Sequence, residues 1–267
     1  MMLVHKFASE PVTVEVETKD RGRMILDLDD MAQFPLYYNI YEWKDTPTVV
    51  SLARNSNIIF DIGGNIGQMA LLFSKYAGKV YTFEPIPAVA ERIEKNIKLN
   101  HLESKIILSR VALTNFKGQI KFGLPPDSNR GTGSTVITES SKNNTIEVEA
   151  TTLDDFILQH GIQDIDLIKM DIEGAELFAL KGMKSILSKT KKPIIILEMT
   201  LAMMKQAGYG PNELMSFLQQ YGYACYEFAK DGLHGPVSEV HPLSENYCFL
   251  TADHLRMEKV KGVLYGG

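Results

Sequence analysis

The sequence predicts an α/β fold with a mostly parallel sheet, and two observations support this prediction. Residues 57–84 read as an apolar strand, a glycine-rich turn, a helix and a second strand that ends on a carboxylate. From residue 153 onward, short apolar runs alternate with amphipathic stretches. Such alternation of strand and helix is typical of sheets that helices cover on two faces.

A β-hairpin is expected to open the chain. Residues 12–18 alternate apolar and polar side chains, and residues 23–28 resume that alternation after a turn at 20–22. Residues 31–53 then read as helical or irregular cover that leads to the first buried strand. Beyond the 57–84 unit, we expect a helix over 88–99 and a third strand over 105–108.

The segment after the third strand differs from this simple alternation. It contains three further candidate strands, over 118–122, 135–138 and 145–150. A loop rich in Pro, Gly, Asn and Ser, over 125–134, interrupts them. Because this loop is too long for a simple connector, we expect it to act as a lid over substrate or cofactor.

The remaining chain returns to strands and helices in turn. Its last two candidate strands, over 223–229 and 246–251, have no helix between them, which predicts an antiparallel end to the sheet. Before them we expect helices over 153–159, 175–187 and 211–221 and strands over 165–170 and 193–199.

The glycine-rich turn indicates the kind of cofactor. Gly63, Gly64 and Gly67 permit positive φ and close approach of a ligand to the backbone, and Asn65 is one of the few other residues tolerated in that conformation. In a Rossmann-type unit this turn binds an adenosine-bearing cofactor, and Glu84 would accept the ribose hydroxyls. The spacing departs from the G-x-G-x-x-G pattern that binds a dinucleotide pyrophosphate.

Two segments resemble known methyltransferase motifs. The Asp61-x-Gly63-x-Asn65-x-Gly67 pattern resembles motif I of S-adenosylmethionine-dependent methyltransferases. Residues 166–177 resemble the K-x-D-x-E-G-x-E signature of the FkbM family of methyltransferases. The resemblance covers roughly residues 40–252, and other matching stretches are 60–67, where Gly64 stands in place of the more usual alanine, 83–85, 152–156 and 196–199.

The resemblance implies both a fold and an activity. The fold is the Rossmann-like class I methyltransferase fold, a seven-stranded mostly parallel sheet with a reversed C-terminal hairpin. An N-terminal hairpin and cover segment (1–50) would precede the methyltransferase domain (51–255), and a C-terminal tail (256–267) would follow it. The implied cofactor is S-adenosyl-L-methionine, and the implied reaction is O-methylation of a hydroxyl on a sugar, polyketide or other small molecule.

The candidate catalytic residues are mainly carboxylates. Asp171 ends a central strand beside the crevice where α/β sheets bind ligands. Glu173 and Glu176, three residues apart on the following turn, could orient an acceptor hydroxyl or take its proton, or could only stabilise a helix N-terminus. His234 is a further candidate base, as is His241, both in a loop near the C-terminus. Glu198 could bind acceptor or close a structural hydrogen bond.

The candidate cofactor-binding residues form a separate group. Ala112, together with Leu113, follows the third strand and could flank the adenine ring. The remaining members belong to the turn and to the strand end after it, namely Asp61, Gly63, Asn65, Gly67 and Glu84. The sequence lacks a compact cluster of oxygen ligands, so we expect no metal site.

Composition restricts the possible partners. A net charge of −5 and a pI near 5.7 disfavour nucleic acid as a partner. The longest apolar runs are strand-sized and the N-terminus lacks a secretory pattern, so we expect no membrane partner and a cytoplasmic location. Cys225 and Cys248 are expected to be free buried thiols.

Two alternative functions remain open at this point. A non-catalytic cofactor-binding module would keep the glycine turn and Glu84 but would not need the carboxylates from Asp171 to Glu176. A nicotinamide-dependent dehydrogenase is disfavoured by the glycine spacing and by the absence of a recognisable set of hydride-transfer residues.

Overall fold

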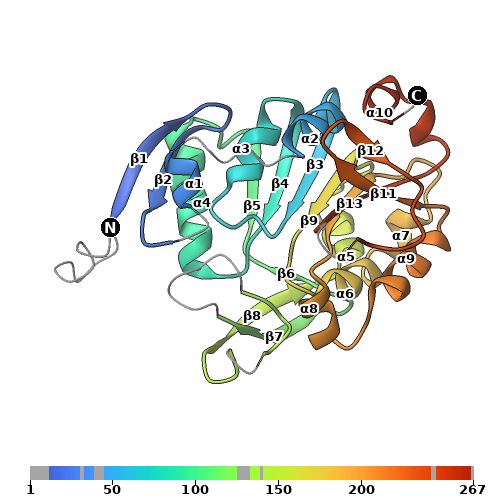
Figure 1. The fold of residues 1–267 in the computed structure, drawn as a ribbon. Helices are drawn as coiled ribbons and strands as arrows, with labels where there is room; N and C mark the ends of the chain where they lie inside the picture. The colour runs from blue at the N-terminus through green and yellow to red at the C-terminus, as the bar shows by residue number, and fades with distance from the viewer. Residues whose placement is uncertain are drawn as a thin grey trace.

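The computed structural model describes residues 12–30, 33–38, 45–124, 133–138, 141–241 and 245–265. A sheet of eight strands forms its centre (Figure 1). These strands are β3 (Ser56–Ile62), β4 (Ala77–Phe83), β5 (Ile106–Ser109), β9 (Leu167–Met170), β10 (Ile194–Glu198), β11 (Ala224–Ala229), β12 (Gly232–His234) and β13 (Asn246–Leu250).

The strand order is β12-β11-β13-β10-β9-β3-β4-β5. The strands from β10 to β5 run parallel to their neighbours, whereas β13 is antiparallel to both β10 and β11. The predicted α/β class and the reversed C-terminal pair are therefore confirmed. The predicted count of seven strands is one too few, because the chain turns back after Ala229 and pairs the short β12 with β11.

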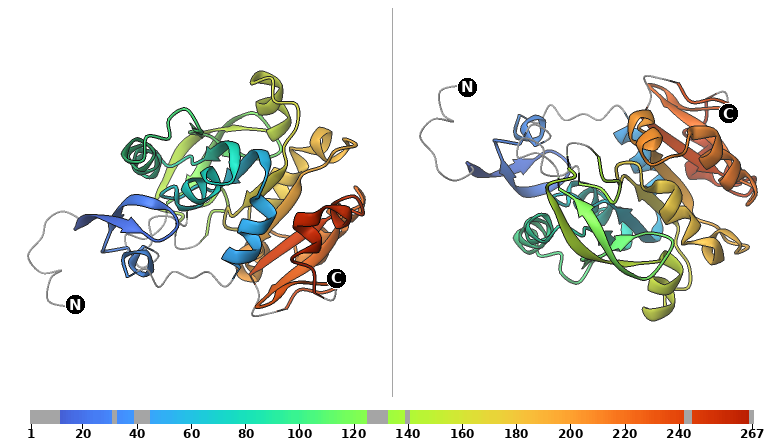
Figure 2. Two further views of the ribbon diagram at one scale, coloured as in Figure 1. Left: turned by 90° about the horizontal axis from the view of Figure 1, so that it is seen from above. Right: turned by 90° about the horizontal axis from the view of Figure 1, so that it is seen from below.

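Helices cover both faces of the sheet and bury a separate apolar core on each face (Figures 1 and 2). One face packs against α1 (Phe34–Tyr37), α2 (Thr46–Ala53), α3 (Gln68–Ser74), α4 (Pro87–Leu99) and α10 (Glu258–Lys261). The other packs against α5 (Leu153–Gln159), α6 (Glu176–Lys181), α7 (Lys184–Leu187), α8 (Leu201–Gln206) and α9 (Pro211–Gln219). A 3-10 turn, η2 (His254–Arg256), precedes α10.

Two helical segments differ from the prediction. The single helix expected over 175–187 is divided into α6 and α7 at Gly182, where a Cβ atom would overlap the carbonyl oxygen of Thr114. The close passage of another segment therefore ends the helix. Helix α8 lies where no element was predicted. Its Met204 side chain is fully buried and packs in the same core as residues of α6 and α9.

A small sheet, separate from the central one, contains β6 (Ala112–Leu113), β7 (Gly118–Gly123) and β8 (Thr145–Thr151) in the order β6-β8-β7. The strand predicted over 135–138 is wrong. Ser134 forms an isolated bridge to Gly123, but the Val136 N–H donates to the Ser134 hydroxyl and the Thr138 N–H donates to the Ser141 hydroxyl, both at 3.0 Å, so these groups do not pair with a strand. Most of the loop predicted as a lid, residues 125–132, lies outside the described residues.

The predicted N-terminal hairpin is confirmed as β1 (Thr13–Thr18) and β2 (Gly22–Asp27), and it lies at one end of the molecule (Figure 2). Side chains of α4, and of Asn100 directly after it, form hydrogen bonds with backbone groups of β2. The Asn96 amide oxygen accepts from the Ile25 N–H at 2.7 Å, and Arg92 donates to the Ile25 carbonyl at 3.1 Å. Asn100 accepts from the Arg23 N–H and donates to the Arg23 carbonyl.

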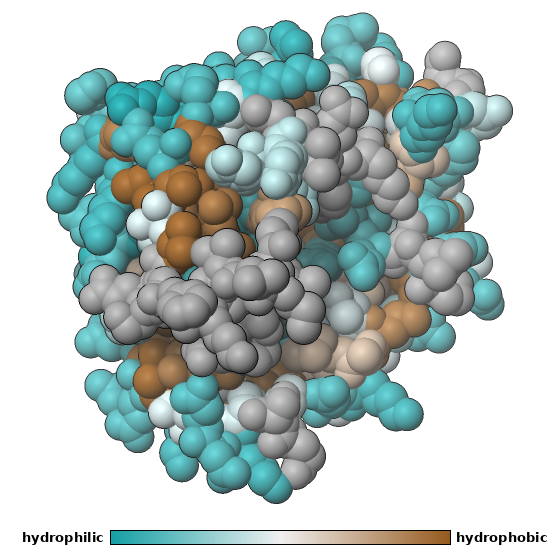
Figure 3. Space-filling model, turned by 60° about the vertical axis from the view of Figure 1, so that its left-hand side comes forward, coloured by the Kyte–Doolittle hydropathy of each residue, from teal (hydrophilic) through white to brown (hydrophobic). Residues whose placement is uncertain are grey.

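Hydrophilic side chains cover most of the rim of the face drawn in Figure 3, and the largest group of hydrophobic side chains lies to the left of its centre. In the part of the chain that the structure describes, no helix combines the length and apolar character needed to span a bilayer.

Candidate functional site

The turn after β3 brings the ends of three strands together. Gly63 has φ +87°, and a Cβ at this position would overlap the carbonyl oxygen of Asp171, which follows β9. Asn65 and Gly67 also have positive φ, at +49° and +88°. The N–H groups of Gly63 and Gly64 both donate to the carbonyl of Phe83, at 3.1 and 2.9 Å. The positive φ angles agree with the prediction, and the close approach at Gly63 is to the protein's own backbone. Close approach of a ligand to this turn stays a prediction.

Glu84 secures this turn from the end of β4. Its side chain is 4% exposed and accepts hydrogen bonds from the N–H groups of Asn65 at 3.1 Å and Ile86 at 2.9 Å. Burial raises the pKa of Glu84 to about 8, although the two N–H donors act in the opposite direction. The carboxyl group is thus fixed in position while retaining lone pairs for a ligand.

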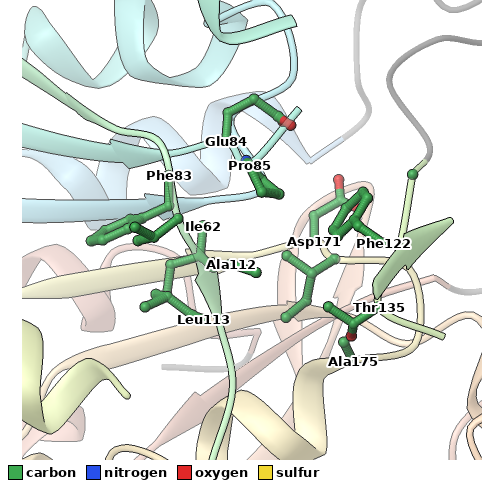
Figure 4. Close-up of a pocket in the computed structure, with 14 residues that line it drawn as sticks. Ile62, Phe83, Glu84, Pro85, Ala112, Leu113, Phe122, Thr135, Asp171 and Ala175 are labelled. Carbon is green, nitrogen blue, oxygen red and sulfur yellow. The ribbon is translucent and has the colours of Figure 1, made fainter. Parts of the chain in front are cut away.

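A partly open cavity lies beside Glu84. Its walls are mostly apolar, and Ala112 lies where it was predicted to flank a ligand ring. In Figure 4 Glu84 lies at the upper side of the view, Phe122 lies beside Asp171, and Ala112, Leu113 and Ala175 lie lower. The described lining comprises Ile62, Gly63, Phe83, Glu84, Pro85, Val111, Ala112, Leu113, Phe122, Gly133, Thr135, Asp171, Ile172 and Ala175.

Asp61 does not line this cavity. Its side chain is completely buried on the α3 side of the sheet, where the Thr82 hydroxyl donates to it at 3.3 Å. Burial raises the pKa of Asp61 to about 6, and the nearby Lys169 ammonium opposes that rise. Asp61 therefore acts on the site through its electrostatic interaction with Lys169, and its backbone leads into the turn.

Lys169 was not among the predicted site residues, yet it lies at the centre of the charged cluster. It pairs with Asp61 across β9 and β3, is 4% exposed, and donates to Asp171 Oδ2 at 2.6 Å. Burial alone would lower the pKa of Lys169, but the carboxyl groups of Asp171, Asp61 and Glu198 raise it above its ordinary value. A lysine inside the otherwise apolar strand Leu167–Met170 is the sequence signal that could have identified it.

Asp171 and Glu198 share one proton. Glu198 ends β10 beside Asp171, as the pairing of Leu197 with Met170 requires. Burial would raise the pKa of Asp171, but Lys169 and a hydrogen bond from Glu198 lower it below its ordinary value. The negative charge of Asp171, then burial, raise the pKa of Glu198 to about 11. At neutral pH, Asp171 is therefore ionised, and it is also one-third exposed at the edge of the cavity.

Glu173 and Glu176 have different surroundings. Glu173 has φ +55° and is half-buried, and burial followed by the charges of Asp171 and Glu176 raises its pKa to about 7. Glu176 is buried and accepts from the N–H of Ile172 at 3.1 Å and from the Tyr209 hydroxyl at 3.2 Å. Of the two roles predicted for Glu176, this geometry favours the stabilisation of the turn.

The structure does not bring the two histidines to the cavity. His234 lies on β12, where it hydrogen-bonds Asp231 at 2.8 Å and its ring lies 4.2 Å from that of Tyr265. Three strands separate β12 from β9, which corresponds to roughly 19 Å at the usual strand spacing. The backbone N–H of His241 donates to the Tyr247 hydroxyl, so Tyr247 holds this segment near the start of β13. The expectation that His234 acts as base at the site is therefore corrected.

Neither metal ligands nor a disulfide stand out in the described part of the chain. No group of three or more His, Cys, Asp and Glu residues there is arranged to hold a metal ion. Cys225 and Cys248 are free, buried thiols, as predicted. Burial raises the pKa of Cys225 to about 12, which makes this thiol unreactive.

The strand order, the reversed β13 and the glycine turn after β3 define a Rossmann-like class I methyltransferase fold. Residues 61–225 match the Methyltransferase FkbM domain. The chain belongs to the FkbM methyltransferase family, as the motifs predicted. This membership also supports S-adenosylmethionine as the cofactor.

Two similar proteins are a hexuronic acid methyltransferase and a 2-O-methyltransferase. The hexuronic acid methyltransferase AglP of Haloferax volcanii is 28% identical over 168 residues, which cover 63% of this chain and 64% of that protein. The 2-O-methyltransferase NoeI of Sinorhizobium fredii is 32% identical over 161 residues, which cover 54% of this chain and 64% of that protein. The chain thus matches less than two thirds of the length of each.

A solved structure similar to this chain is that of methyltransferase FkbM from Methylobacillus flagellatus. It is 18% identical with a TM-score of 0.49, and the match covers 73% of this chain and 44% of that one.

Proposed function

We propose that this chain is an S-adenosylmethionine-dependent O-methyltransferase whose acceptor is a hydroxyl of a sugar, polyketide or other small molecule. The observation that supports this best is the position of Asp171, which lies at the edge of the cavity and is kept ionised by Lys169 at 2.6 Å. A carboxylate at that position can hold an acceptor hydroxyl next to a bound cofactor. The similarity to a hexuronic acid methyltransferase and a 2-O-methyltransferase favours a carbohydrate among these acceptors.

The cavity has the groups that this cofactor requires. Glu84 would accept the ribose hydroxyls, and Ala112 and Leu113 would contact the adenine ring through their apolar side chains. The backbone of the turn at Gly63 would lie against the remainder of the molecule. S-adenosylmethionine supplies a methyl group activated by a positively charged sulfur when bound.

Asp171 and Glu173 have different roles toward the acceptor in this proposal. Asp171 accepts a hydrogen bond from the acceptor hydroxyl and so fixes the attacking oxygen, which must lie about 3 Å from the methyl carbon. As the O–H bond breaks, the proton passes to Glu173, whose pKa of about 7 suits a base near neutral pH. Lys169 does not touch the acceptor and acts as a positioning residue through its ion pair with Asp171.

The test uses Asp171→Asn and Glu173→Gln, with D-glucuronate as acceptor and release of S-adenosylhomocysteine as readout. We expect both variants to bind S-adenosylhomocysteine within about threefold of wild type in calorimetry, and turnover to fall by about 10²–10⁴-fold. The wild-type rate should rise with pH through about 7, and Glu173→Gln should abolish this rise. Unchanged turnover in Asp171→Asn would remove that residue from the mechanism.

The proposal includes a cytoplasmic location and a partner that is neither nucleic acid nor membrane. The two free thiols, Cys225 and Cys248, are typical of a reducing compartment. The net charge of −5 disfavours polyanionic partners. Binding of a fluorescent oligonucleotide at physiological salt tests the second part, and micromolar affinity would contradict it.

A further inference from the structure

A row of polar side chains runs away from the cofactor cavity along the edge of the sheet. Asp171 follows β9, Glu198 ends β10 and Asn246 begins β13. The pairing of Glu198 with Asn246, and of Leu197 with Met170, places these residues side by side on three adjacent strands. The row spans two strand spacings, or about 10 Å.

Strand alternation puts the last two members on one face. Glu198 lies two residues after Ile196, and Asn246 two residues before Cys248, and these two apolar residues pack in the same core. The Met199 N–H donates to the Glu245 carbonyl at 2.6 Å, so the ladder continues beyond this pair. The side chains of Glu198 and Asn246 are therefore held next to each other.

Asn246 has an unmet hydrogen-bonding requirement. The residue is 7% exposed, and its Oδ1 atom has no hydrogen-bond partner among the described residues. A buried amide oxygen without a donor is costly and rare in native proteins. A ligand hydroxyl that reaches the end of β13 would satisfy it.

Glu198 supplies the complementary chemistry. Its pKa of about 11 means that the carboxyl group carries a proton at neutral pH. That proton is donated to Asp171, so toward a ligand Glu198 acts as an acceptor. Together with ionised Asp171 and the Asn246 Oδ1 atom, the row offers acceptors on three adjacent strands, to which separate hydroxyls of one ring can donate.

Building on the proposed function, we propose that Glu198 and Asn246 form a second hydroxyl-binding subsite, so that the acceptor is a polyhydroxylated ring. One hydroxyl lies at Asp171 for methylation, and another donates to Asn246 Oδ1. A site built in this way discriminates against acceptors that lack the second hydroxyl, because Asn246 would then stay unpaired.

The test measures binding of D-glucose and D-glucuronate to the protein saturated with S-adenosylhomocysteine. Calorimetric titration of the wild type should detect at least one of the two. Asn246→Leu removes the amide at similar volume and should weaken that binding about tenfold without altering affinity for S-adenosylhomocysteine. Cys248→Ala is the matched control, because it changes a buried side chain on the same strand and face.

Thermal melting of both variants separates recognition from stability. The control should lower the melting temperature and leave the sugar affinity unchanged. Equal sugar affinity in wild type and Asn246→Leu, or an equal loss in Cys248→Ala, overturns the subsite. A wild type that binds S-adenosylhomocysteine but neither sugar also overturns the subsite while the cofactor assignment stands. A wild type that does not bind S-adenosylhomocysteine overturns the proposed function and the subsite together.

Discussion

The proposed cofactor side and the proposed acceptor side of this site are built in different ways. On the cofactor side, one continuous stretch makes the turn, and backbone geometry determines it: Gly63 and Gly67 have positive φ, and Glu84 receives backbone N–H groups. On the acceptor side, Lys169, Asp171 and Glu198 come from two strands and interact through charge. The first side depends on backbone conformation and the second on the order of strands in the sheet.

This difference predicts how each side responds to change. A backbone turn fails when a side chain is added, whereas a charged cluster fails when one member is removed. The two sides touch closely where the turn at Gly63 lies against the carbonyl of Asp171. A change at that contact should disturb both sides at once.

Gly63→Ala should have the largest effect. The new Cβ would overlap the Asp171 carbonyl, and φ of +87° adds strain, so we expect a destabilisation of at least about 3 kcal/mol and loss of S-adenosylhomocysteine binding. Differential scanning calorimetry and titration calorimetry measure the two losses.

Gly208→Ala is the matched control for Gly63→Ala. Gly208 also has positive φ, +85°, but no atom lies within 4 Å of the added Cβ. We expect it to cost only the backbone strain, about 1 kcal/mol, and to leave cofactor binding intact. Similar losses in the two variants would show that the contact with Asp171 is unimportant.

Lys169→Met should affect the acceptor side far more than the cofactor side. It leaves Asp61 and Asp171 without their buried countercharge, a loss of about 3 kcal/mol at neutral pH. Without the ammonium, the pKa of Asp171 rises, so the destabilisation should shrink as pH falls and the carboxylates take up protons. Urea unfolding at pH 5.5 and pH 8 checks this sign.

Lys191→Met provides the comparison for Lys169→Met. Lys191 pairs with Asp166 at 3.0 Å but is half-exposed, so its removal should cost less than about 1 kcal/mol. Equal destabilisation by the two lysine variants would contradict a special role for the buried one.

Glu84→Gln should weaken the cofactor side in a pH-dependent way. The folded-state pKa of about 8 lies above the ordinary 4.5, so the associated stability is present below about pH 4.5 and is lost as pH rises through 8. The ionised form would accept hydrogen bonds from the ribose hydroxyls more strongly than the protonated form, so wild-type affinity for S-adenosylhomocysteine should increase from pH 6 to 8. The variant should bind about tenfold more weakly at pH 8.5 with a flat pH profile, and a parallel rise in both proteins would exclude Glu84 as the ribose ligand.

His234→Ala should have the smallest effect and so define the far limit of the acceptor side. The residue lies on β12, two strands beyond β13, and its partner Asp231 is more than half exposed. We expect less than about 0.5 kcal/mol of destabilisation and unchanged turnover of D-glucuronate. A turnover loss above tenfold would extend the acceptor side to this edge.

The same contrast explains which parts of the fold could be predicted from the sequence. The hairpin at residues 12–28, the turn at Gly63 and the helix Leu153–Gln159 follow local rules of alternation, glycine conformation and capping, and the structure confirms them. The break at Gly182 could not be predicted, because it is imposed by Thr114, a residue far away in the chain. The short β12 and α8 likewise depend on pairing and burial against distant segments.

For the site, the sequence predicted residues more successfully than their partners. Glu84, Ala112 and Asp171 line one cavity, as expected from the strand ends that they occupy. Asn246 carried no signal of its own, because its position beside Glu198 follows only from the insertion of β13 between β10 and β11. His234 was predicted from the chemistry of its side chain, but the strand order places it on the edge strand β12, away from the cavity.

The amide side chains of Asn96 and Asn100 act on β2 as a neighbouring strand would, by engaging its outward N–H and C=O groups. An exposed strand edge is normally a template on which other chains can assemble into aggregates. Here a helix closes that template without adding a strand. The hairpin can therefore extend from the end of the molecule without recruiting other copies through this edge.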